Sequence, residues 1–324
     1  MLVASAACSS NPADAPPPTI SPARAADSPP TAAAPDGVVL PLNGPGQAGV
    51  FDQSTGTLVV LGADPAGRSV VTMLSSSSPA RAMVLPAAAT ALTTDDHGTA
   101  YVSARGGYFR VDVAGGGVTR MDVAGAGNTD FTAIAHRADG KIVLGSADGA
   151  VYTLSSDTAV AARLQIFARV DALVAQGDTV VVLDRGQTSV TTVDASGTRA
   201  DHALRAGDGA TTIAADSAGR VLVADTRGDE LLVFGADPLM LRQRYPVPGA
   251  PYGLTGSARL TWVSETATNS VVGYDLATGI PVEKVRYRTV RQPNSLAFDN
   301  HTGTLYVVSG SGAGVQVISG AGPK

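Results

Sequence analysis

A repeat with a period of about 40 residues constrains the fold of this 324-residue chain more than any other feature. The unit is clearest at 211–234, where three short apolar or β-branched runs are separated by the turns 216–219 and 225–229. Its middle run begins in seven copies at Thr57, Thr99, Lys141, Thr179, Arg220, Leu260 and Thr304, with intervals of 42, 42, 38, 41, 40 and 44 residues. Each interval accommodates about four strands. The pattern predicts an all-β fold, a seven-bladed β-propeller with four-stranded blades.

The first run of each copy combines a large aliphatic residue with a small residue directly before it. The aliphatic residues are Val50, Leu92, Ile134, Leu173, Ile213, Leu254 and Leu296, and the small ones are Gly49, Ala91, Ala133, Ala172, Thr212, Gly253 and Ser295. Neighbouring residues of a strand point to opposite sides. We therefore expect the small residues to face a crowded central channel and the aliphatic residues to pack between blades.

The last copy has only three strands (295–298, 304–308 and 314–318) before the chain ends at Lys324. The segment Val38–Leu42 (V-V-L-P-L) has no place in the first copy. We expect this N-terminal strand to complete the last blade, which closes the ring and removes an open sheet edge.

The single cysteine, Cys8, follows the apolar segment M-L-V-A-S-A-A and precedes Ser9, Ser10 and Asn11. This arrangement is typical of the end of a bacterial lipoprotein signal, in which the thiol is acylated, for example by palmitate. It departs from that pattern by lacking a basic n-region, which a start codon placed too late would explain, and by Ser5 three positions before the cysteine. We expect residues 1–8 to be a residual signal and Cys8 the lipid attachment site; a free cysteine in a flexible tail is the alternative.

Residues 9–36 contain eight of the twenty prolines, interleaved with Ala, Ser and Thr. Their only large apolar residue is Ile20, so the segment has little surface to bury and is expected to be a disordered tether. The propeller is expected at 37–319, followed by a short tail at 320–324. Together with Cys8, this organisation predicts an extracytoplasmic protein held on the cytoplasmic membrane by lipid.

Charge and composition exclude some partners. The net charge is −5, only 16% of residues are charged, and no basic cluster occurs, which argues against a nucleic-acid surface. No run of 18 apolar residues is present, so no membrane span is expected. We expect a monomer.

Candidate site residues come from the end of the second strand of each copy, on the face where propeller ligands usually bind. The residues at this position are Gly62, Ala104, Ser146, Asp184, Asp225, Glu265 and Ser309. Three consecutive blades thus carry carboxylates, which would form an acidic arc. The side chains that could approach it are Asp171, Arg185, Arg227 and Asn294, with Asp130, Arg169 and Tyr252.

Carboxylates gathered beside an asparagine could hold a hard divalent cation such as calcium, and no particular metal is indicated. Alternatively, each acid accepts hydrogen bonds from the N–H groups of its own turn. The histidines offer no paired ligand spacing: His97 and His301 fall in turns on the opposite face, and His136 and His202 have no partner.

Several segments resemble known propeller repeats. Ala250–Glu265 (A-P-Y-G-L-T-G-S-A-R-L-T-W-V-S-E), Gln292–Asp299 (Q-P-N-S-L-A-F-D) and Val221–Phe234 resemble the YVTN and NHL repeats. The chain also looks like the mycobacterial lipoprotein LppL family. That resemblance rests on the segments Asp95–Ala100, Arg105–Phe109, Leu144–Leu154, Val182–Thr192 and Tyr306–Ile318. It covers nearly everything after Cys8, implies an acylated envelope protein, and assigns no functional residues.

Three functions fit these observations. The first is a binding or scaffolding module of the cell envelope, with an unidentified protein, glycan or small-molecule ligand. The second is a metal-dependent hydrolase or lactonase-type enzyme that uses the acidic arc. The third is a sensor-like domain for cell-wall glycan or peptide. Because propellers host many activities, the fold alone does not choose among them.

Overall fold

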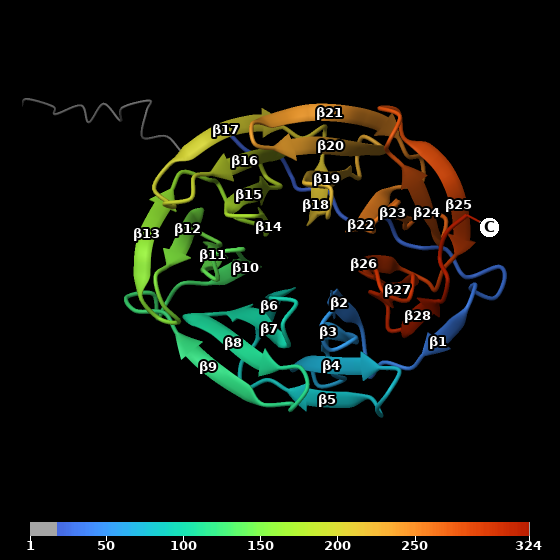
Figure 1. Ribbon diagram of the computed structural model, residues 1–324, viewed down its shortest axis with the longest axis horizontal. Helices are drawn as coiled ribbons and strands as arrows, with labels where there is room; N and C mark the ends of the chain where they lie inside the picture. The colour runs from blue at the N-terminus through green and yellow to red at the C-terminus, as the bar shows by residue number, and fades with distance from the viewer. Residues whose placement is uncertain (1–17, 324) are drawn as a thin grey trace, which may run out of the picture.

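The computed structural model describes residues 18–323 as seven four-stranded antiparallel sheets arranged in a ring (Figure 1). The predicted seven-bladed propeller is therefore confirmed. Cys8 and residues 9–17 of the predicted tether lie outside the described residues. No helix within 18–323 is long and apolar enough to cross a membrane.

The first four blades follow the chain in order. Blade 1 contains β2 (Gly46–Asp52), β3 (Thr57–Ala63), β4 (Ser69–Ser75) and β5 (Arg81–Val84). Blade 2 contains β6 (Ala89–Thr94), β7 (Thr99–Ala104), β8 (Gly107–Asp112) and β9 (Val118–Asp122). Blade 3 contains β10 (Phe131–His136), β11 (Ile142–Ser146), β12 (Ala150–Leu154) and β13 (Val160–Gln165). Blade 4 contains β14 (Ala172–Gln176), β15 (Thr179–Asp184), β16 (Ser189–Val193) and β17 (Ala200–Arg205).

The last three blades complete the ring. Blade 5 contains β18 (Ala210–Ala215), β19 (Arg220–Asp225), β20 (Glu230–Ala236) and β21 (Leu239–Pro246). Blade 6 contains β22 (Pro251–Gly256), β23 (Thr261–Glu265), β24 (Ser270–Asp275) and β25 (Val282–Arg288). Blade 7 combines β26 (Pro293–Asp299), β27 (Thr304–Ser309) and β28 (Val315–Ile318) with β1 (Val38–Leu40).

The predicted closure of the ring by the N-terminal strand is also confirmed. β1 pairs antiparallel with β28, with Val38 opposite Val317 and Leu40 opposite Val315. Just before β1, the Asp36 carboxylate accepts a hydrogen bond from Arg288 at 3.0 Å. This hydrogen bond is the main reason why the pKa of Asp36 lies below its usual value.

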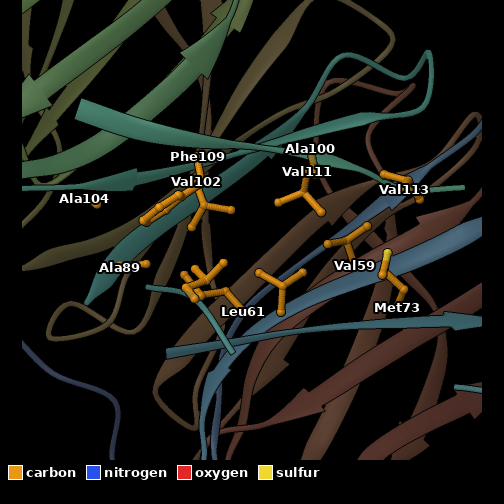
Figure 2. Packing of buried hydrophobic residues seen from close by; sticks show 12 residues of the cluster. Val59, Leu61, Met73, Ala89, Ala100, Val102, Ala104, Phe109, Val111 and Val113 are labelled. Atoms are coloured by element: carbon orange, nitrogen blue, oxygen red, sulfur yellow. The ribbon is translucent and has the colours of Figure 1, made fainter. Parts of the chain in front are cut away.

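The hydrophobic core is divided among the seven interfaces between blades, with one cluster of buried side chains at each. Figure 2 shows the cluster between blades 1 and 2, in which Val59 and Leu61 meet Val102 and Phe109. Because each sheet buries both faces against its neighbours, its middle strands are continuous apolar runs, such as Val180–Leu183.

The small residues of the innermost strands do not face the channel as expected. Leu173 packs in the cluster between blades 3 and 4, whereas Ala172 packs against the cluster between blades 4 and 5. Both sides of an inner strand therefore face neighbouring blades, and small residues are needed because the sheets converge near the axis. Blade 1 differs: Val50 faces blade 2, and a Cβ atom on Gly49 would lie 2.8 Å from Val308 of blade 7.

Hydroxyl groups of several blades also bond to a carbonyl of the next blade. Thr90 donates to Phe131 O at 2.6 Å, Thr132 to Val170 O at 2.5 Å and Ser264 to Pro293 O at 2.5 Å. These bonds cross the interfaces between blades 2 and 3, 3 and 4, and 6 and 7. They add polar connections to the apolar packing and fix neighbouring blades relative to one another.

The N-terminal strap, residues 18–36, is not the free tether that composition predicts. It runs without helix or strand against the ring, seen as the dark blue segment beside blades 4 to 6 (Figure 1). Within it, Ala23 is 7% exposed and Ser28 is 2% exposed, whereas most other side chains face solvent. The strap contacts the loops that carry the candidate site residues.

Candidate functional site

The top face of the ring is formed by the loops between second and third strands and by the connections from each blade to the next. Asp184, Asp225 and Glu265 end β15, β19 and β23, which is the shared position expected from the repeat. All three are almost fully buried. Their burial requires hydrogen-bond partners, since an unpaired buried carboxylate is strongly unfavourable.

Asp184 and Asp225 bind backbone N–H groups of their own blades. The Asp184 carboxylate accepts from Ala168 N at 2.8 Å and Gln187 N at 2.9 Å. The Asp225 carboxylate accepts from Asp208 N at 2.8 Å and Gly209 N at 2.7 Å. Asp225 also accepts from Gly228 N at 3.1 Å, so each carboxylate joins the entering connection of its blade to the turn that follows its own strand, as in the turn-locking alternative.

Glu265 forms an ion pair with an arginine of the same blade. Its Oε2 atom accepts from Arg286 at 2.5 Å, Ser270 Oγ at 2.7 Å and Thr268 Oγ1 at 3.1 Å. Hydrogen bonds to Glu283 and to Glu265 raise the pKa of Arg286, so the guanidinium stays charged. Among the described residues, Oε1 of Glu265 has no hydrogen-bond partner.

The carboxylates do not assemble into a cation site. Across 18–323, no three His, Cys, Asp or Glu side chains are grouped so that they could hold a metal ion. Asp171 accepts from Arg185 N at 2.8 Å and from Arg169 Nε at 3.1 Å. Asn294 accepts from Gln292 Nε2 at 3.1 Å. Asp171 therefore connects two neighbouring loops, whereas the Asn294 contact is local, with a residue two positions before it.

The two predicted arginines bind the N-terminal strap. Arg185 donates to the carbonyl oxygen of Ala23, and Arg227 donates to that of Ser21 at 2.7 Å. Ile20 N donates to Gly186 O at 2.7 Å, beside Arg185. The first part of the strap therefore lies over blades 4 and 5, where the sequence placed part of the acidic arc.

Four residues that the sequence analysis did not single out hold the second part of the strap, over blades 6 and 7. Thr266 accepts from Ala26 N at 3.1 Å, and Asn269 donates to Pro29 O at 2.9 Å. Arg291 donates to Ser28 O at 3.0 Å, and Gln292 Nε2 donates to Ala26 O at 2.9 Å. Ser28 N donates to Gln292 Oε1 at 3.1 Å.

Ser28 is the most deeply held residue of the strap. Its Oγ donates to Thr266 O at 2.6 Å and accepts from Gln292 N at 3.0 Å. A sequence signal for this contact would have been weak, because Ser28 resembles every other serine of the proline-rich segment. Asn269 precedes β24 without any motif that marks it. Gln292 is the first residue of the segment Gln292–Asp299 that resembles a propeller repeat, but that resemblance assigns it no binding role.

The four histidines lie away from these contacts. His97 and His301 are in the turns between first and second strands, at the opposite end of the blades, as expected. His136 ends β10 at that same end and stacks on Tyr101, with ring centroids 5.4 Å apart. His202 is in the outer strand β17. Burial lowers the pKa of His136, so its imidazole is neutral near pH 7.

A further hollow lies at the rim between blades 6 and 7. It has a volume of about 650 Å³ and is bounded by β25 on one side and by β1 and β28 on the other. Its polar lining includes Asp36, Lys284 and Arg286. It is separate from the loops that carry Asp184 and Asp225.

No protein-family model matches the chain, and no similar curated protein was found. Membership of the LppL family therefore stays a resemblance. Solved structures are similar in fold. A streptogramin B lyase superposes with a TM-score of 0.70 at 12% identity, covering 88% of this chain and 97% of that one.

Virginiamycin B lyase from Staphylococcus aureus superposes with a TM-score of 0.69 at 11% identity, covering 86% of this chain and 98% of the lyase. Hydrazine synthase from Kuenenia stuttgartiensis gives 0.67 at 14% identity, covering 88% and 97%. The superpositions show a shared fold. At identities this low, no activity can be transferred from these proteins to this chain. The chain is similar to these β-propellers in architecture alone.

Proposed function

We propose that the protein is a lipid-anchored, extracytoplasmic binding module that presents the top face of its propeller to a ligand in the cell envelope. The observation that carries this proposal is how the top face uses its polar groups. Its buried carboxylates lock turns, while Arg185, Arg227, Arg291 and Gln292 point at the carbonyl groups of an extended segment. Such an arrangement favours binding of an extended peptide segment over catalysis of a reaction.

Catalysis is the second candidate, because three of the similar structures are lyases by name. One of these relatives is described as catalytically inactive when a single histidine is replaced by alanine, in a structure with quinupristin. In this chain the four histidines lie at the opposite end of the blades or on an outer strand. A metal-dependent hydrolase is disfavoured for a related reason, since Asp184 and Asp225 already accept several backbone hydrogen bonds each.

Anchoring at Cys8 would set the distance and orientation of the propeller. Eleven residues separate Cys8 from Ile20, the first strap residue with a hydrogen bond to the ring. An extended chain of that length spans at most about 40 Å. A free tether up to Gly37 would span about 100 Å. The docked strap would thus hold the top face close to the membrane and turned toward it.

Membrane attachment is tested by expressing the chain behind a complete lipoprotein signal and separating the proteins of the cell lysate by detergent phase partition. We expect the parent protein in the detergent phase and the Cys8→Ser variant in the aqueous phase or unprocessed. A serine substitution elsewhere in the proline-rich segment, Ala13→Ser, is the matched control and should partition like the parent. Normal processing and anchoring of Cys8→Ser would refute the lipid attachment.

A further inference from the structure

We propose that the top face over blades 4 to 7 is a binding site for an extended, proline-containing peptide of another protein, and that the N-terminal strap occupies it in cis. This inference rests on the proposed binding function and names its ligand class. The strap is bound to this site in the structure, so its contacts show which features of a peptide the site can bind.

The site binds mainly the backbone of the peptide. Ten hydrogen bonds join residues 20–29 to the top-face loops, and eight of them use backbone N–H or C=O groups of the strap. The other two use the Ser28 hydroxyl. Backbone contacts of this kind tolerate many side chains, as in other modes of extended-peptide recognition. A different peptide of similar shape could therefore make most of the same bonds.

Two positions of the peptide must be small. Ala23 and Ser28, five residues apart, are the buried side chains of the strap. A Cβ atom on Gly209 would come within 2.9 Å of the Ala23 Cβ atom, so the floor of the site is close at this point. The residues between these two positions are partly or fully exposed. The ligand is accordingly an extended peptide with small residues at two positions five apart.

The loops under the strap hold backbone conformations that are usually reserved for glycine. Six non-glycine residues among those described have positive φ, and five of them are in these loops: Thr188, Asp229, Ala250, Asn269 and Gln292, with φ between 45° and 57°. At the turn position of Thr188, Asp229 and Asn269, blades 2, 3 and 7 have Gly106, Gly149 and Gly314. Conformations of this kind concentrate at ligand-binding sites, where function compensates for their strain.

Asn269 shows what this substitution achieves. Its left-handed backbone directs the side-chain amide to Pro29 O of the strap at 2.9 Å, which a glycine could not bind. Its Oδ1 atom and Nε of Arg185 are buried and lack hydrogen-bond partners within the described residues. Both belong to the strap-binding loops, so the site has binding capacity beyond what the strap uses.

The strap is suited to exchange. Prolines at 18, 22, 29 and 30 restrict its backbone before docking, which reduces the entropy lost on binding. Because Ala23 is the only buried apolar side chain within residues 18–36, docking of the strap depends mainly on its hydrogen bonds, and a peptide in solution can compete for them. In cis the strap is present at high effective concentration, so it weakens the apparent affinity for a competitor without preventing binding.

The test uses the full chain with the strap displaced by Ala23→Glu and Ser28→Lys, which place large charged side chains at both buried positions. The probe is a fluorescein-labelled peptide with the sequence of residues 18–30, followed by fluorescence anisotropy. We expect saturable binding to the displaced-strap chain and at least tenfold weaker binding to the parent chain. A peptide carrying the same two substitutions should bind at least tenfold more weakly.

Adding Gln292→Ala to the displaced-strap chain should weaken probe binding at least tenfold, because the Gln292 side chain makes two hydrogen bonds to the strap, with Ser28 N and Ala26 O. Gln165→Ala, an exposed glutamine on β13, is the matched control and should leave binding unchanged. Far-UV circular dichroism and the melting temperature check that the blades remain folded. Hydrogen exchange of the Ala26 and Ser28 amides in the parent chain provides a second measurement, and both should be protected.

Two results would overturn the proposal. One is a folded displaced-strap chain without saturable binding of the probe. The other is a parent protein that sediments as a dimer and dissociates when the strap is displaced, because the occupant would then be a second copy of this chain. Neither result depends on lipid attachment, so a failure here is distinguishable from a failure of membrane anchoring at Cys8.

Discussion

Closure of the ring by β1 can be tested with two shortened chains. One begins at Gly37 and retains β1, and the other begins at Asn43 and lacks it. Both lack the N-terminal strap and the Asp36–Arg288 ion pair, so those contributions cancel in the comparison. The difference between the two chains isolates the strand Val38–Leu40 and the adjoining Leu42.

The magnitude follows from how these residues are buried. Val38 is 63% exposed and Val39 is 38% exposed, so the valines contribute little apolar burial. Leu40 and Leu42 pack partly buried against the cluster between blades 7 and 1. Half-burying two leucines is worth about 2 kcal/mol. A ladder over three residue pairs adds two or three hydrogen bonds, or about 3 kcal/mol.

The expected loss is therefore about 5 kcal/mol, a large part of the stability of about 5–15 kcal/mol that is usual for a folded protein. For a chain of this size it corresponds to a fall of roughly 10 °C in the melting temperature. Differential scanning calorimetry and urea denaturation measure it. In the full chain, Leu40→Ala should cost about 1–2 kcal/mol and its control Val38→Ala less than about 0.5 kcal/mol. Equal melting temperatures for the two shortened chains would refute the closure argument.

Two further predictions concern the ionisable groups. Three substitutions, Asp184→Asn, Asp225→Asn and Glu265→Gln, should each lower the free energy of unfolding by about 1–3 kcal/mol, and the losses should add. Adding calcium should not change the melting temperature of the parent protein; stabilisation by calcium would instead indicate a shared site. His136 has a lowered pKa in the folded protein, so its contribution to stability is present above its unfolded pKa of about 6.5 and is lost as the pH falls through the lower folded value. His136→Gln should reduce the fall in melting temperature between pH 7 and pH 5, and an unchanged pH profile would contradict this origin.

The sequence predicted the architecture because the period, the apolar middle strands and the unpaired segment Val38–Leu42 are local patterns. Any fold that buries both faces of seven such sheets must stack them. The extra strand near the N-terminus must then pair with the last blade, which has only three strands of its own. The shared position of Asp184, Asp225 and Glu265 was predictable for the same reason. The hydrogen-bond partners of these side chains could not be predicted. Asp184, for example, accepts from Ala168 N, sixteen residues earlier on a loop with no recognisable motif.

The sequence by itself thus determined seven blades, their strand order and the closure of the ring, since each depends on hydrophobic periodicity and chain connectivity. The tertiary structure alone decided which inner residues face which neighbour, and it alone placed the strap. Composition predicts a free tether at 9–36 because the segment has almost no apolar surface to bury. The structure docks residues 18–36 because loops more than 150 residues away in sequence align carbonyl-binding arginines and amides along one extended backbone.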